Sequence, residues 1–215
     1  MDYGELLIKE CVRQHEQKYG TDAVYSGSLE KMRQVDLDNI TEETVERIVE
    51  PFLYEWGRMG RVLGRPDFRD WQSDLAVQIR SKHKVLTVFR DRHLLEVSLG
   101  DFESDVRNCY DSFRHTVGQI ASVKVLHLIC PDFFPLWDNA IAKGIRTELV
   151  ENTNGERIKE FSSADYYRFM RGIQTLLNRY REVFKQLANQ HAKRQLRILD
   201  EFLWWVTHRP LSLVI

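Results

Sequence analysis

The sequence has no long hydrophobic run, and this absence excludes a class of protein. Its apolar runs span only a handful of residues, far short of the roughly 20 that a helix needs to cross a bilayer. The opening residues, MDYGELLIKE, lack the basic-then-apolar order of a signal peptide. We therefore expect no membrane partner and a cytoplasmic location.

Cysteine and the common binding motifs are also scarce. The three cysteines, Cys11, Cys109 and Cys130, are far apart and form no CxxC pair or Cys/His ligand spacing. This argues against a disulfide framework and a zinc site, and predicts small buried hydrophobic side chains. There is no Walker loop, GxGxxG, GxSxG, HExxH or DxDxDG motif. We expect neither a metal nor a cofactor. His115 and His127 belong to no ligand set, so we predict hydrogen-bonded structural histidines.

Acidic and basic residues nearly cancel over the whole chain, but they are distributed unevenly along it. The formal net charge is −1, so the chain as a whole is not an electrostatic nucleic-acid binder. Residues 1–57 carry six Lys/Arg against thirteen Asp/Glu, whereas residues 171–197 carry seven Lys/Arg against Glu182 alone. This pattern predicts an acidic face and a basic face. The basic face suits a nucleic-acid backbone, but a solvated surface has the same composition.

The chain length and the hydrophobic periodicity favour an all-α, two-lobed helical domain that spans residues 1–215. We expect an acidic N-terminal lobe at about 1–63, a core with a hairpin-like segment at about 102–149, and basic C-terminal helices at about 162–208. Apolar spacing predicts helices over 2–19, 102–115, 162–187 and 196–207, and favours helices over 71–99.

Several local signals refine these boundaries. Thr41 is predicted to cap a helix, Pro51 to break or kink it, and residues 24–28 to form a turn. Gly100 and Asp101 resemble a helix end followed by a new cap, and the sequence SSAD at 162–165 has the spacing of a capping box.

Residues 116–146, TVGQIASVKVLHLICPDFFPLWDNAIAKGIR, contain the densest group of special residues. An apolar helix there ends at Pro131 and is followed by a corner rich in proline and phenylalanine. Asp138 follows that corner and precedes another predicted helix. A carboxylate in this setting is either a helix N-cap or a catalytic acid with a tuned pKa, and the residues alone leave both open.

This stretch resembles the helix-hairpin-helix DNA glycosylase superfamily. The residues that carry the resemblance are a helix over 102–115, a hairpin at 117–120, a second helix over 121–130, and then Asp138. The segments Lys-x-Leu-His and Pro-x-x-Phe-Pro-x-Trp-Asp are also similar to stretches in uncharacterised bacterial and archaeal proteins. The family hairpin usually has a second glycine, where this chain has Ile120. Its lysine nucleophile aligns with Ser122, and Lys124 is two residues later.

The resemblance implies roles for individual residues. Asp138 would be the catalytic carboxylate of a monofunctional N-glycosylase, with Lys124 as a weaker catalytic candidate. The nucleic-acid backbone would be held at the hairpin and second helix and by basic residues after the Asp: Gly118, Gln119, Ser122, Lys143 and Arg146. Trp137 or Trp56 would stack on an extruded base. Asn139 would join the substrate site. Independently of the resemblance, Arg58 and Arg61 are one helical turn apart, so they either clamp a phosphate or carboxylate of the substrate or form ion pairs with the acidic N-terminal lobe.

The sequence therefore predicts an N-glycosylase-like enzyme that acts on a nucleic-acid base or a nucleoside. In this reaction an Asp stabilises the oxocarbenium ion or activates water. The alternative is a non-catalytic helical module that binds nucleic acid or protein. A further possibility is an accessory protein of a phage or mobile element with a small-molecule pocket. The sequence gives no prediction of the oligomeric state.

Overall fold

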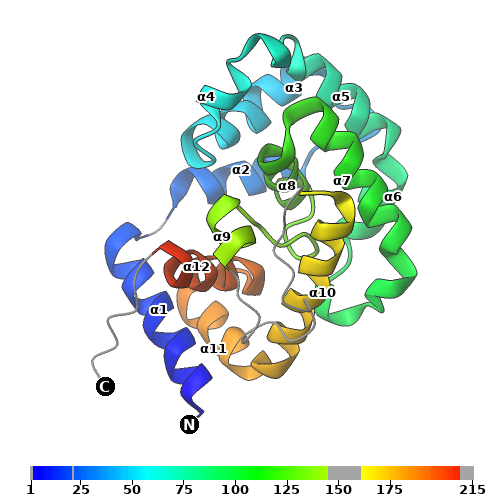
Figure 1. The fold of residues 1–215 in the computed structure, drawn as a ribbon. Coiled ribbons are helices and arrows are strands. Elements are labelled where there is room, and N and C mark those ends of the chain that lie inside the picture. The colour runs from blue at the N-terminus through cyan, green and yellow to red at the C-terminus, as the bar shows by residue number, and fades with distance from the viewer. Residues whose placement is uncertain (1, 21, 145–160, 209–215) are drawn as a thin grey trace.

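A computed structural model describes residues 2–20, 22–144 and 161–208, and the regular structure within these ranges is helical, without a strand (Figure 1). The predicted all-α class is confirmed. Within the same ranges, no helix combines the length and the apolar character that crossing a membrane requires.

The N-terminal half of the chain is built from one long helix and several shorter helical segments. They are α1 (Tyr3–Tyr19), α2 (Ala23–Arg33), α3 (Glu42–Thr44), the π-helices η1 (Val45–Val49) and η2 (Phe52–Trp56), α4 (Gly60–Leu63), the 3-10 helix η3 (Pro66–Phe68), α5 (Trp71–Ser81), α6 (His83–Arg90), and the 3-10 helices η4 (Leu94–Glu96) and η5 (Leu99–Phe102). The helical interpretation of residues 71–99 is therefore confirmed.

The second half contains longer helices. They are α7 (Glu103–Val117), α8 (Gln119–Ile129), α9 (Asn139–Gly144), α10 (Ser163–Arg179), α11 (Arg181–His191) and α12 (Gln195–His208). The expected helices over 102–115 and 196–207 are confirmed by α7 and α12. The expected long helix over 162–187 is divided at Tyr180, so that α10 and α11 are separate helices.

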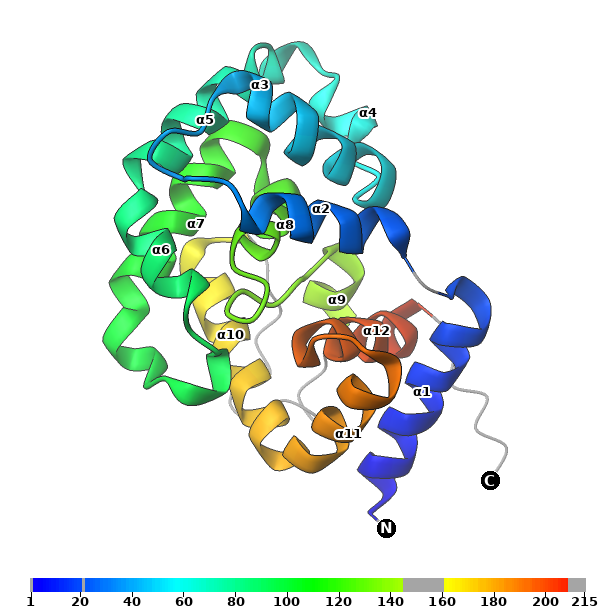
Figure 2. The same cartoon turned by 180° about the vertical axis from the view of Figure 1, so that it is seen from behind.

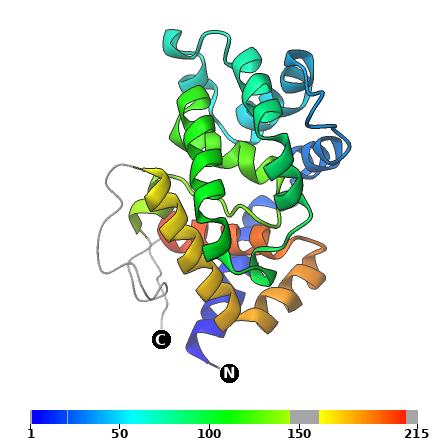
Figure 3. The ribbon, with the colours of Figure 1, turned by 90° about the vertical axis from the view of Figure 1, so that its right-hand side faces the viewer.

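Helix α8 lies at the centre of the fold. It is apolar nearly all round, and a helix of that kind is stable only when other elements cover it. Helix α7 pairs with it through the turn at Gly118, while α2 and η2 cover another side (Figures 1 and 2). Helix α10 runs beside α7 (Figure 3). Residues carried by α8 are therefore held from several directions.

The N-terminal helix packs against the C-terminal helices. Helix α1 contacts α12 and α11, whereas α2, η1 and η2 pack around α8 and α5 (Figure 2). Residues 1–63 are thus divided between two ends of the molecule, and α12 is enclosed between α1, α11 and α9.

Local signals gave the correct caps in most places. Gly20 ends α1, the Thr41 hydroxyl accepts a hydrogen bond from the Thr44 N–H, and Ser162 with Asp165 forms the predicted capping box. All three cysteines are buried and free, as predicted.

Two local predictions are wrong, and of the two outcomes predicted for Pro51 the break does not occur. Residues 24–28 belong to α2, because the Asp22 carboxylate caps that helix at Tyr25. Asp101 lies inside η5, so it does not cap α7. Pro51 does not break the helical path, because the turns around it widen: the Glu50 N–H bonds to the Val45 carbonyl, five residues earlier.

Candidate functional site

Asp138 stands at the N-terminus of α9 and caps it. One carboxylate oxygen, Oδ1, accepts a hydrogen bond of 2.7 Å from the Ile141 N–H. The other oxygen, Oδ2, lies 3.5 Å from Nε2 of His208 on α12, and 31% of the Asp138 side chain remains exposed. Of the two alternatives for Asp138, the helix N-cap is confirmed, and the carboxylate is not sealed by backbone N–H groups alone.

Lys124 reaches the same region from the middle of α8. Its ammonium donates a 2.7 Å hydrogen bond to the Gly57 carbonyl and lies 5.4 Å from the ring centroid of Trp56. Burial lowers the pKa of the Lys124 amine, and the nearby charges of Asp200 and Asp138 act against that shift. The fold therefore brings both candidate catalytic residues into one electrostatic cluster.

Helix α12 adds buried charges to this cluster. Arg197 is buried, forms an ion pair with Asp200, and lies 5.1 Å and 5.4 Å from the ring centroids of Tyr25 and Trp56. Burial raises the pKa of Asp200, the Arg197 charge opposes this, and the Asp138 charge adds to it. Lys124 and Arg197 thus both lie beside the Trp56 ring, and the charges of Asp138 and Asp200 act on this group of side chains.

A second cluster ties α1 to α12. The potential metal-ligand atoms of His15, Glu16 and Glu201 all lie within 4.8 Å of one another. Lys193, however, donates hydrogen bonds to both glutamates, so a cation already bridges them. Burial lowers the pKa of His15 to about 4 and raises that of Glu201 to about 7. The arrangement fits a partly buried ion-pair cluster.

A buried chain of hydrogen bonds links α2, α8 and the segment that follows α8. Nδ1 of His127 lies 2.8 Å from the Phe134 carbonyl oxygen, which can only accept, so Nδ1 carries the proton. Nε2 therefore accepts from the Tyr25 hydroxyl at 2.7 Å. Burial lowers the pKa of His127 to about 3. His127 is thus a structural histidine, as predicted, and His115 is likewise bonded to the Asp111 carbonyl.

Two residues expected to touch substrate or nucleic acid lie in the core instead. Trp137 is only 1% exposed and packs against Tyr110, Phe161 and Tyr166. A ring enclosed in this way has no free face for a base. Ser122 is fully buried and donates its hydroxyl to the Gln119 carbonyl, so it cannot contact a phosphate.

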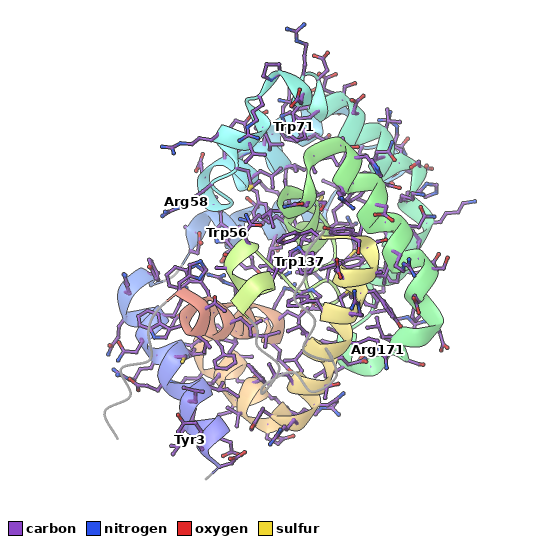
Figure 4. All side chains as sticks on the ribbon, viewed as in Figure 1. Tyr3, Trp56, Arg58, Trp71, Trp137 and Arg171 are labelled. Atoms are coloured by element: carbon purple, nitrogen blue, oxygen red, sulfur yellow. The ribbon has the colours of Figure 1, made fainter. Side chains whose placement is uncertain are left out.

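Trp56 differs from Trp137 in its surroundings. It is partly buried, stacks on Phe52, and belongs to the cluster around Lys124 and Arg197. Figure 4 places Trp56 and Trp137 on different sides of α9 in its view. Of the two tryptophans predicted to contact substrate, Trp56 alone lies among the charged side chains.

The turn between α7 and α8 is shorter than the predicted hairpin. It consists of Gly118, with φ +81°, and α8 begins at Gln119. The Gly118 N–H is already bonded to the Arg114 carbonyl. An open groove of about 480 Å³ lies beside this turn, and its lining includes Phe68, Trp71, Ser112 and His115.

The remaining residues predicted to contact substrate or nucleic acid lie at the surface or outside the part of the chain that the structure describes. Arg58, Arg61 and Asn139 are exposed, and Figure 4 shows Arg58 next to Trp56. Arg58 has φ +53°, and its positive charge contributes to lowering the pKa of Lys124. Lys143 lies in α9, but its side chain lies outside the described part, as does Arg146 altogether.

Part of the expected basic face is neutralised. Among the basic residues of 171–197, Lys193, Arg194 and Arg197 are committed to ion pairs with Glu16, Asp132 and Asp200. Arg197 is also buried. The cationic surface that α10 to α12 offer to a nucleic acid is therefore smaller than the composition suggests.

Sequence reasoning missed Arg197, Asp200 and His208 as members of the site. The sequence does contain a signal for Asp200: together with Glu201 it interrupts the apolar stripe of α12 between Leu199 and Phe202. Charged residues on a buried helix face are costly unless they are paired.

Comparison of the chain with protein-family models, curated sequences and solved structures finds no match.

Proposed function

We propose that this protein is an N-glycosylase-like hydrolase that cleaves the bond between a base and its sugar in a nucleic acid or a nucleoside. Asp138 is its catalytic carboxylate. The observation that carries the proposal is the state of that side chain: one oxygen is fixed by a helix N–H, and the side chain is open to solvent within a cluster of buried charges.

The chemistry requires a carboxylate held in this way. Cleavage of an N-glycosidic bond builds positive charge on the sugar, and a fixed negative group nearby stabilises that transition state. The capping bond to Ile141 holds Asp138 in position before substrate arrives. Preorganisation of this kind lowers the barrier, because the group does not have to reorient during the reaction.

Lys124 has a supporting role in this proposal. Its amine is tied to the Gly57 carbonyl and lies near the Trp56 ring, where it faces the negative charges of Asp138 and Asp200. We therefore assign it to the electrostatic balance of the site, and the monofunctional reaction needs no covalent intermediate on it. Trp56 and the exposed Arg58 are the groups beside this cluster that are suited to a base and a phosphate.

The test is a base-release assay on the full chain. The probes are duplexes that carry uracil, hypoxanthine or an N7-alkylated guanine, together with the free nucleosides. Asp138→Asn keeps an N-capping side chain, because Asn and Asp cap helices about equally well, but removes the charge. We expect release to fall by about 100-fold or more. Asp2→Asn, which alters the cap of α1, should leave release unchanged.

Two results would contradict the proposal. One is the absence of base release by the wild-type chain from every probe. The other is equal release by the wild type and Asp138→Asn. Duplex binding that weakens with salt and is indifferent to Asp138→Asn, without base release, would instead identify a binding module.

A further inference from the structure

His208 stands in the last turn of α12 with one ring nitrogen fixed. Its Nδ1 lies 3.0 Å from the Trp204 carbonyl oxygen and 3.1 Å from the Thr207 hydroxyl. The ring also stacks on Trp204, with centroids 4.6 Å apart and planes 11° from parallel. These contacts set both the position of the ring and the direction in which Nε2 points.

The hydrogen bonds of Nδ1 determine the state of Nε2. A carbonyl oxygen only accepts, and the Thr207 hydroxyl already donates to the Leu203 carbonyl at 2.8 Å. Nδ1 of His208 therefore carries the ring proton in the neutral imidazole. Nε2 is left with a lone pair, and it faces Oδ2 of Asp138 at 3.5 Å.

With a neutral imidazole and an ionised carboxylate, the two facing atoms are both acceptors, and a proton donor between them can bond to both. The separation of 3.5 Å is longer than a good hydrogen bond. A water molecule has two protons, and it can donate one to Nε2 and the other to Oδ2. Both side chains are accessible to solvent, at 30% for His208 and 31% for Asp138. The pair is thus built to hold and orient a water molecule.

We propose that His208 is a second catalytic residue, which together with Asp138 binds the attacking water and removes its proton. This inference rests on the proposed function, because it names the base for that hydrolysis. The water oxygen bonds to the anomeric carbon while the bond from that carbon to the base nitrogen breaks. The bonding electron pair leaves with the nitrogen. The water proton passes to Nε2 of His208, and the imidazolium then protonates the departed base.

Neighbouring charges suit this proton transfer. The Asp138 carboxylate lies 3.5 Å from Nε2, the nitrogen that takes the proton in this step. Lys124, Asp200 and Arg197 are the other charged groups of the cluster, and Asp200 is paired with Arg197. In this proposal Asp138 has two roles: it stabilises the positive charge on the sugar, and together with His208 it holds the water.

Chemical rescue tests the assignment. His208→Ala should lower base release from the same probes by about 100-fold. Added imidazole should raise the release by this variant at least about tenfold. His115→Ala is the matched control, because His115 also bonds through Nδ1 to the carbonyl four residues earlier, that of Asp111. It should retain full release and show no response to imidazole.

The outcomes separate this inference from the proposed function. Loss of release in Asp138→Asn with full release in His208→Ala would overturn the role of His208 and leave the function intact. A loss in His208→Ala that imidazole does not restore would also overturn it.

A second measurement needs no substrate. In ¹⁵N spectra of the histidine rings, neutral His208 should carry its proton on Nδ1. A proton on Nε2 would overturn the inference, because Nε2 would then donate directly to Asp138 and could not accept from water.

Discussion

His127 gives the most quantitative prediction of this structure. The pKa of its buried ring is lowered from 6.5 to about 3. The folded protein therefore keeps the ring neutral, while the unfolded chain binds a proton below about pH 6.5. Stability from this group is fully present above that pH and is lost as the pH falls toward the folded pKa, because protons favour the unfolded state.

The size of the effect follows from the pH interval. Between pH 7 and pH 5 the unfolded chain gains most of a proton at His127, which lowers the free energy of unfolding by about 2 kcal/mol. His127→Asn removes this titration and keeps a donor for the Phe134 carbonyl. It removes the acceptor for the Tyr25 hydroxyl, at a cost of about 2 kcal/mol. The variant should be less stable than the wild type at pH 7 and about equally stable at pH 5.

The assay is urea unfolding followed by tryptophan fluorescence at both pH values. Tyr25→Phe is the control, since it breaks the same 2.7 Å bond but leaves the histidine in place. Its deficit relative to wild type should be the same at pH 7 and pH 5. If the deficit of His127→Asn were also the same at both pH values, the inference of a neutral buried ring would be refuted.

Two further predictions concern the turn and the thiols. Gly118→Ala should lower the free energy of unfolding by about 1–3 kcal/mol, because φ is +81° and an added Cβ would lie 3.3 Å from the Phe68 ring. Gly100→Ala, with nothing within 4 Å of its Cβ, is the control for the same urea assay, and equal losses would contradict the reasoning. Burial raises the pKa of Cys11 and Cys109 to about 12, and it raises the pKa of Cys130 well above its usual value. A thiol reagent should therefore label the native protein only as fast as it unfolds, whereas rapid labelling without urea would show an exposed thiolate.

Sequence analysis predicted the features that depend on near neighbours in the chain. The helical class, the cap at Thr41, the capping box at Ser162 and the cap at Asp138 all follow from interactions over three or four residues. Such signals are complete within one helical turn, so no knowledge of distant segments is needed. The local errors at residues 24–28 and at Asp101 came from short segments in which turn and helix signals overlap.

Which of the two candidate tryptophans, Trp56 or Trp137, is buried in the core could not be predicted in the same way. Trp56 and Trp137 have the same chemistry, and each lies close in the chain to several apolar residues. Packing of Trp137 against Tyr110, Phe161 and Tyr166 decides that it belongs to the core. Burial of a large ring is set by what other segments bring to it, and those segments lie elsewhere in the chain.

By itself, the sequence determined the helical class and most of the longer helices, and it singled out Asp138 as a carboxylate at the start of one. The tertiary structure alone decided which groups surround that carboxylate. Lys124 comes from α8, while Asp200 and His208 come from α12, far along the chain. The physical reason is that electrostatic and hydrogen-bonding partners are selected by distance in space, and only tertiary packing, such as that of α9 on α12, brings side chains from separate elements within range.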